Sequence, residues 1–141
     1  EDLKKKVLIL MSDTGGGHRA SAEALKAAFD KIYPNLIEVS IVDIWTEYGV
    51  YPFNKFVESY QFMARRPPLW KMFWEYGKYP LTRLGTEIWS NFFCFKNFEK
   101  CIKSEAPDLV ISVHPLCQKI PMKILRKIKR EKNLKRQIPF V

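Results

Sequence analysis

The most informative stretch of this chain is Val7-Leu8-Ile9-Leu10-Met11-Ser12-Asp13-Thr14-Gly15-Gly16-Gly17-His18-Arg19. An apolar run with β-branched residues is typical of a buried parallel strand, and the alanine-rich pattern that follows, up to Ile32, is typical of a helix. The glycines between them predict a strand–turn–helix unit whose backbone can approach a ligand closely. Because the first N–H groups of a helix have no partner within it, this turn is a candidate site for an anion or a diphosphate.

A titratable side chain follows the last glycine of the turn. Imidazole changes its charge near neutral pH, so His18 is placed for proton transfer as well as for binding. The turn is not a Walker A loop, because no Lys-Ser/Thr pair follows its last glycine, and no G-x-G-x-x-G dinucleotide fingerprint fits. A functional turn and a purely structural connection both fit these residues. Asp43, after the second apolar run, is interpreted as a strand-end or loop-capping residue.

The remaining pattern alternates strands with helices. We predict strands at 6–11, 38–43 and 108–113, helices at 17–32 and 116–132, and the opening of a further strand at 138–141. This order predicts an α/β fold with a parallel, doubly wound sheet. The 141 residues have the size of one domain, 47% of them are hydrophobic, and no apolar run is long enough to span a bilayer. Because the chain begins with Glu1 and ends in a strand-like segment, we expect a partner domain outside it.

The chain has two histidines, and both follow predicted strands. In an open α/β sheet, ligands bind outside the carboxyl ends of the strands. His18 and His114 should therefore lie on the same edge of the sheet, which makes His114 a candidate residue of a ligand cleft. A capping or packing role for His114 fits equally well.

Residues 45–98, between the second and third strands, form an aromatic insertion that holds all four tryptophans. They are interleaved with the cations Lys55, Arg65, Arg66, Lys71, Lys78 and Arg83. Trp and Tyr favour the membrane interface, and Lys and Arg pair with lipid headgroups, so this composition indicates membrane contact. An aromatic core or partner interface is an alternative, and base stacking on nucleic acid is a third.

The formal charge of +9 implies an anionic partner, such as nucleotide phosphates, nucleic acid or an acidic membrane surface. Nine cations lie between Lys119 and Arg136, on the polar face of a predicted amphipathic helix, where a solvated surface also explains them. The three cysteines fit neither a C-x-x-C pair nor a zinc spacing. We interpret them as reduced, mostly buried thiols, which favours a reducing compartment. The pattern contains no metal-ligand cluster and no nucleic-acid reader motif.

Residues 12–24, SDTGGGHRASAEA, resemble the N-terminal domain of monogalactosyldiacylglycerol synthases. Four further segments resemble it in the same order: Asp43-Ile44-Trp45-Thr46, Pro52-Phe53-Asn54, Leu69-Trp70-Lys71-Met72 and Ile111-Ser112-Val113-His114-Pro115-Leu116. Bacterial diacylglycerol glucosyltransferases, which have a Gly-x-Gly-His version of the first motif, are similar more distantly. The resemblance covers nearly the whole chain.

The resemblance implies a GT-B architecture of two Rossmann-like domains. Residues 1–141 would be the N-terminal domain, which binds diacylglycerol and touches the membrane, while an absent C-terminal domain would bind UDP-galactose. The implied activity is transfer of galactose from UDP-galactose to 1,2-diacylglycerol at the plastid envelope. Alternatives are a diacylglycerol glucosyltransferase at a cytoplasmic membrane surface, and a basic lipid-binding module without chemistry.

The resemblance also assigns roles to residues. His18 would be the catalytic base, and Gly15, Gly16 and Gly17 would border the donor diphosphate. Pro52 would act with His18 in the response to anionic phosphatidylglycerol, a possible activator. The acceptor and membrane would contact the insertion, with Phe53, Trp70, Lys71 and Trp74 as candidates. Apart from the UDP-sugar co-substrate, no cofactor and no metal are expected.

Overall fold

The computed structural model describes residues 3–141 and contains a three-stranded parallel sheet. Its strands are β1 (Lys5–Met11), β2 (Ile37–Asp43) and β3 (Leu109–Ser112), in the order β2-β1-β3. The strand-like segment at the end of the chain adds a parallel bridge between Phe140 and Val110. The predicted sheet is therefore confirmed, and the last segment extends it beside β3.

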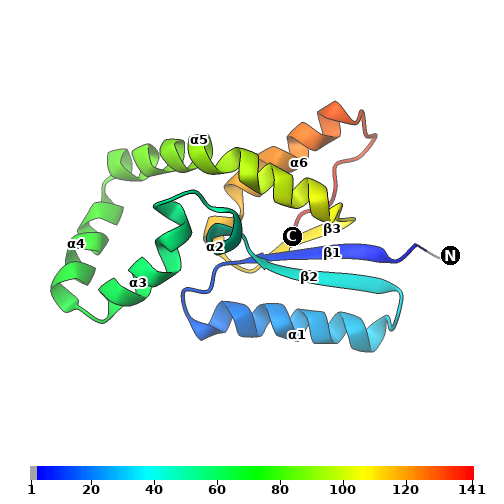
Figure 1. Cartoon of the computed structure of the whole chain (residues 1–141), viewed down its shortest axis with the longest axis horizontal. Coiled ribbons are helices and arrows are strands. Elements are labelled where there is room, and N and C mark those ends of the chain that lie inside the picture. The colour runs from blue at the N-terminus through cyan, green and yellow to red at the C-terminus, as the bar shows by residue number, and fades with distance from the viewer. Residues whose placement is uncertain (1–2) are drawn as a thin grey trace.

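Helices cover both faces of the sheet (Figure 1). Alternate β1 residues face opposite sides, as the period of a strand requires. Val7, Ile9 and Met11 pack with α1 (Gly16–Ile32), whereas Leu8 and Leu10 belong to a second cluster with α5 (Pro80–Glu105) and α6 (Lys119–Glu131). This three-layer arrangement is the Rossmann-like α/β fold that the sequence predicted.

The segment between β2 and β3 is helical and only partly an insertion. It consists of α2 (Ile44–Tyr48), a 3-10 turn η1 (Phe53–Lys55), α3 (Phe56–Ala64), α4 (Pro67–Lys78) and α5. Figure 1 shows α3, α4 and the beginning of α5 projecting beyond the sheet. The second half of α5, with Cys94, Phe98 and Ile102 buried, packs in the core as an ordinary crossover helix.

Membrane contact therefore does not hold for the buried residues at the C-terminal end of the insertion. Among residues 90–98, the core alternative holds for Ser90, Cys94 and Phe98, which are buried, whereas Phe92 and Phe93 are exposed. Apolar side chains are exposed in the first half of α5 and buried in the second half, within one continuous helix of 26 residues. No proline or turn separates the two halves. Within residues 3–141, no helix is both long enough and apolar enough to cross a membrane.

The basic helix also differs slightly from its prediction. Pro115 begins a 3-10 turn, η2 (Pro115–Cys117), and α6 starts only at Lys119. Its apolar face is buried as expected, through Ile120, Pro121, Ile124, Leu125 and Ile128.

Part of its basic face is neutralised by acidic residues of α5. Lys119 lies 2.8 Å from Glu87, and Lys127 lies 2.7 Å from Glu99. In the part of the chain that the structure describes, the other cations of α6 make no ion pair: Lys123, Arg126, Lys129 and Arg130.

All three cysteines are free and buried. Burial raises the pKa of the Cys101 thiol to about 11 and that of the Cys117 thiol to about 12. These thiols are thus protonated at neutral pH and unreactive, as expected for structural cysteines.

Candidate functional site

The glycine turn joins the carboxyl end of β1 to the start of α1. Gly15 is the extended residue before the helix, and no side chain caps the helix N-terminus. No glycine among residues 3–141 has a positive φ, and a Cβ added to Gly15, Gly16 or Gly17 would meet no atom within 4 Å. Neither backbone conformation nor packing within the chain therefore requires these glycines, and the space beside their Cα atoms is open.

Charged residues tie this turn to the beginning of α2. The Arg19 guanidinium donates from Nε to Asp13 Oδ2 at 2.9 Å, and the Asp13 backbone N–H donates to Asp43 Oδ2 at 3.1 Å. The other oxygen of Asp43 accepts from the Thr46 backbone N–H at 3.2 Å, so Asp43 caps α2. The predicted capping role of Asp43 is confirmed, and it links the turns after β1 and β2.

The half-buried His18 ring has a defined orientation. Its Nδ1 lies 2.8 Å from the backbone oxygen of Val113, at the end of β3. A carbonyl oxygen can only accept a hydrogen bond, so Nδ1 carries a hydrogen. In the neutral ring the lone pair is then on Nε2, which makes no hydrogen bond within the described part of the chain. This arrangement is the one required of a general base.

His114 lies directly against this ring. The two ring centroids are 4.3 Å apart at an interplanar angle of 57°. His114 is buried, its Nδ1 accepts a hydrogen bond from the Leu116 backbone N–H at 3.1 Å, and its Nε2 lies 3.3 Å from the Thr14 hydroxyl oxygen. Burial lowers the pKa of His114, and the nearby charge of His18 lowers it further, whereas Asp43 opposes the shift.

The structure thus brings together the two histidines that the sequence placed on one edge. The capping interpretation of His114 also holds, because its side chain caps η2. Two partners were not found from the sequence: the Thr14 hydroxyl and the Val113 carbonyl. Thr14 could have been suspected as a polar residue directly before the glycines. The Val113 carbonyl could not, because a backbone carbonyl leaves no pattern in the sequence.

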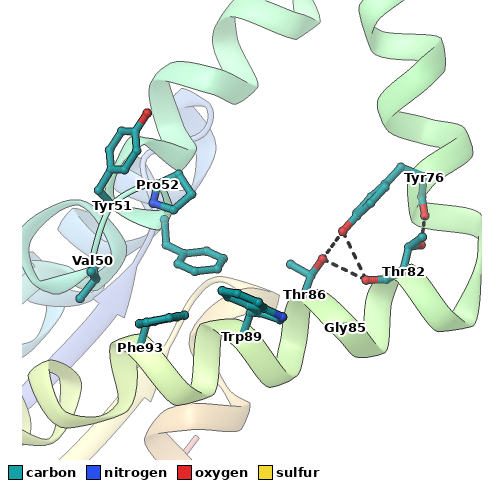
Figure 2. A pocket seen from close by; sticks show the side chains of 10 residues that line it. Val50, Tyr51, Pro52, Tyr76, Thr82, Gly85, Thr86, Trp89 and Phe93 are labelled. Carbon is teal, nitrogen blue, oxygen red and sulfur yellow. Dashed lines mark hydrogen bonds between the residues drawn. The ribbon is translucent and has the colours of Figure 1, made fainter.

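An apolar pocket of about 680 Å³ lies between the segment after α2 and the helices α4 and α5 (Figure 2). Pro52 and Phe53, two predicted site residues, form one wall together with Val50 and Tyr51. The opposite wall comes from α4 and α5, through Tyr76, Thr82, Gly85, Thr86, Trp89 and Phe93. Hydrogen bonds of the Tyr76 hydroxyl with the Thr86 hydroxyl and the Thr82 backbone oxygen join the two helices.

Three predicted site residues, Trp70, Lys71 and Trp74, lie on α4 and outside the lining of this pocket. The pocket residues of α4 and α5 were not singled out in the sequence, since their spacing is also that of an ordinary helix face.

The tryptophans divide into interior and surface residues. Trp45 is buried and packs edge-on against Phe98, with ring centroids 5.0 Å apart, so the core interpretation is right for this residue. Trp70 is half-buried against Tyr60, at 5.4 Å. Trp74 and Trp89 are 60% and 63% exposed.

The exposed rings are accompanied by other exposed large apolar side chains from α4 to the first half of α5, a set that we call the apolar face. Its members are Met72, Trp74, Tyr76, Tyr79, Leu81, Leu84, Ile88, Trp89, Phe92 and Phe93. Soluble monomers rarely expose so many large apolar side chains together, so this face indicates contact with a membrane or a partner. Within residues 3–141, no group of three or more His, Cys, Asp or Glu side chains is arranged to hold a metal ion.

The sheet order, the helices on both faces and the glycine turn with its histidine pair define a Rossmann-like domain of the GT-B type. The family described as "Monogalactosyldiacylglycerol (MGDG) synthase" matches residues 18–140, and the chain belongs to this family. The resemblance seen in the sequence motifs is thereby confirmed.

Individual relatives are plant proteins. The monogalactosyldiacylglycerol synthase of Spinacia oleracea, named as chloroplastic, is 45% identical over 123 residues, which cover 86% of this chain and 23% of the relative. Monogalactosyldiacylglycerol synthase 1 of Arabidopsis thaliana, also named as chloroplastic, is 42% identical over 140 residues, or 99% of this chain and 25% of the relative. A probable synthase of Glycine max is 44% identical over 137 residues. The chain thus spans about a quarter of the length of these relatives.

Proposed function

We propose that this chain is the acceptor-side domain of a glycosyltransferase that transfers galactose from UDP-galactose to 1,2-diacylglycerol and forms monogalactosyldiacylglycerol. Family membership supports the reaction, and the length of the relatives supports a second, donor-binding domain outside residues 1–141. We also propose a peripheral location at the plastid envelope, in keeping with the chloroplastic names of the relatives.

One observation carries the chemical part of this proposal: the lone pair of His18 Nε2 is unused while Nδ1–H is held by the Val113 carbonyl. His18 Nε2 removes the proton from the acceptor hydroxyl, and the hydroxyl oxygen attacks the anomeric carbon in line. The bond from that carbon to the diphosphate breaks, the diphosphate leaves with the electron pair, and the anomeric configuration inverts. Proton transfer by a positioned group of this kind contributes about 10²–10⁴-fold to a rate.

The glycine turn is suited to the donor side. No side chain caps the first N–H groups of α1, and the space beside the three glycines is open, so these N–H groups can donate to the oxygens of a diphosphate that enters there. Donors fixed before the reaction stabilise the charge that develops on the leaving group. No further cofactor is proposed, and a divalent cation, if the reaction uses one, would be held outside residues 1–141.

In this proposal, the insertion binds the acceptor lipid and contacts the membrane. The pocket bordered by Pro52 and Phe53 supplies apolar walls for the lipid, and the apolar face supplies contact with the bilayer. Lys71 and Arg83 lie among the exposed rings and make no ion pair within residues 3–141, so they are available to anionic headgroups such as phosphatidylglycerol. Trp70 supports this surface from inside, by packing between α3 and α4.

The test is product analysis of the full-length protein with diacylglycerol and either UDP-galactose or UDP-glucose. We expect a galactolipid, and we expect His18→Ala to abolish transfer while UDP-galactose binding persists. The control is Asn97→Ala, an exposed change on α5 that should leave transfer intact. Formation of a glucolipid alone would place the protein with diacylglycerol glucosyltransferases, and full activity of a folded His18→Ala variant would remove His18 from the chemistry.

A second candidate function is favoured by the exposed apolar face and by the charge of +9: the isolated chain is a basic module that binds anionic lipid surfaces. Flotation with phosphatidylglycerol vesicles, compared with purely zwitterionic vesicles and a single-stranded oligonucleotide, tests it. Tighter binding to the oligonucleotide than to the anionic vesicles would contradict both the transferase proposal and the lipid-binding module, because each requires lipid to be the preferred partner.

A further inference from the structure

The turn after β3 is held by several hydrogen bonds. The Val113 backbone N–H donates to Leu10 of β1 at 3.1 Å, and the Cys117 N–H donates to the backbone oxygen of His114 at 3.0 Å. The indole N–H of Trp45 donates to the Leu116 oxygen at 3.1 Å. The Val113 carbonyl that accepts from His18 is therefore part of a fixed backbone segment.

The His114 side chain joins this segment to the glycine turn, in addition to the His18–Val113 hydrogen bond. Its Nδ1 accepts from the Leu116 N–H, so Nδ1 bears no hydrogen and the neutral ring is the Nε2–H tautomer. Nε2–H then donates to the Thr14 hydroxyl oxygen at 3.3 Å. Nδ1 of His114 is thus hydrogen-bonded to the turn after β3, and Nε2 is hydrogen-bonded to the glycine turn.

The same ring limits the movement of His18. The centroid distance of 4.3 Å leaves no room for His18 to rotate toward His114, and the Val113 carbonyl holds the other side of the His18 ring. An unconstrained neutral imidazole favours the Nε2–H form, in which Nε2 could not accept a proton. The surroundings of His18 enforce the opposite tautomer.

His114 must itself remain neutral for this to work, since a second positive ring at this distance would oppose the protonation of His18. Burial disfavours its charged form, whereas the nearby Asp43 carboxylate favours it. A charged ring would carry a hydrogen on Nδ1 as well and would lose the hydrogen bond that Nδ1 accepts from the Leu116 N–H, so this contact also fits a neutral ring.

We propose that His114 is a positioning residue for His18: it holds the turns after β1 and β3 together and keeps His18 in the Nδ1–H tautomer, with Nε2 free toward the acceptor. The catalytic consequence rests on the proposed transferase function, whereas the tautomers can be measured without any reaction.

The first experiment is long-range ¹H–¹⁵N NMR of the imidazoles in the 141-residue chain, which has two histidines, so that His18→Gln assigns both rings. We expect His18 as the Nδ1–H tautomer when neutral, and His114 as the Nε2–H tautomer. In His114→Asn, which keeps an acceptor for the Leu116 N–H but lacks the ring, His18 should shift toward the Nε2–H form.

The second experiment compares variants in the full-length protein. His114→Asn should lower kcat about tenfold and leave the KM for UDP-galactose nearly unchanged. A catalytic group displaced by 1 Å can cost about 100-fold in rate, and we expect a smaller displacement of His18 here. Thr14→Val, which removes the oxygen that accepts from His114, should lower kcat in the same direction. Thr14→Ser keeps that oxygen and should restore the wild-type rate.

The outcomes separate the two proposals. The positioning role is overturned if His18 keeps the Nδ1–H tautomer in a folded His114→Asn chain, or if His114 in the wild type is not the Nε2–H tautomer. If His114→Asn does not fold, the tautomer of His18 in Thr14→Val decides in the same way. Absence of galactosyl transfer in the wild type, with the expected tautomers present, would contradict the proposed function alone.

Discussion

Replacing Trp74 and Trp89 by alanine tests whether the apolar face binds membranes. The two rings project from α4 and α5 and are 60% and 63% exposed, so their removal opens no core cavity. The cations Lys71 and Arg83 lie nearby on the same helices. We expect the double variant to keep its melting temperature and to lose affinity for phosphatidylglycerol vesicles.

The size of the loss follows from the area of the rings. A Trp side chain buries about 200 Å², so about 120 Å² of each ring is free to enter a lipid interface. At about 25 cal/mol per Å², complete burial of that area stabilises the bound state by about 3 kcal/mol per ring. Immersion of about half of it gives about 1.5 kcal/mol per ring, and hence an affinity about 100-fold lower for the double variant.

The assay is vesicle sedimentation combined with tryptophan emission. Binding of the wild type should shift the emission to the blue, because Trp74 and Trp89 leave water. The shift should vanish in the double variant, since Trp45 is buried and Trp70 is packed against Tyr60 in the free protein. Each nearby Lys or Arg should contribute about 1 kcal/mol to the free energy of binding to anionic vesicles. This contribution should weaken near 1 M salt, where the Debye length is about 3 Å.

The matched control is Trp70→Ala, which should lower the melting temperature because Trp70 packs α3 against α4. A folded double variant that binds vesicles as tightly as the wild type, with the same blue shift, would refute a membrane role for these rings. The apolar face would then be a protein interface.

Three further predictions concern two glycines and one ion pair. Gly49→Ala should destabilise the fold by about 2 kcal/mol in thermal unfolding, because its Cβ would overlap the Trp45 backbone oxygen. Gly17→Ala should leave the melting temperature unchanged or higher, since alanine favours helix by up to about 1 kcal/mol, and should weaken UDP-galactose binding in calorimetry. A hydrogen bond from Lys127 lowers the pKa of Glu99 below its ordinary 4.5, so its stabilisation is complete above that value and is lost as the pH falls through the lowered pKa. Glu99→Gln should therefore flatten the pH dependence of the melting temperature below pH 4.5, and an unchanged dependence would contradict this assignment.

The strand–turn–helix unit could be predicted because each of its parts has a local signal. The apolar run of β1 is buried on both faces, which removes the alternation of polar residues that a one-sided strand shows. Asp43 could be assigned as a cap from its place at a strand end, and the shared edge of His18 and His114 followed from the geometry of parallel strands.

The division of α5 could not be predicted, because it depends on what lies against each half of the helix. Phe92 and Phe98 are the same residue type six positions apart, yet Phe92 is 79% exposed and Phe98 is fully buried under the sheet. The tautomer of His18 also could not be predicted, because it is set by the backbone carbonyl of Val113. Every residue has such a carbonyl, so the sequence does not show which one His18 contacts.

The two parts of the molecule differ in how tightly their side chains are held, and the proposed reaction requires that difference. At the strand edge, His18 and His114 are each fixed through hydrogen bonds to neighbouring turns, as in-line attack on a sugar carbon demands a base placed with little freedom. In the insertion, the pocket walls and the apolar face consist largely of exposed aromatic and aliphatic side chains. Such a surface imposes no single geometry, which suits acyl chains of variable length and unsaturation. A fixed edge that carries the chemistry and an adaptable surface that holds the lipid are therefore joined by the short segment from Asp43 to Phe53, the segment that both caps α2 and lines the pocket.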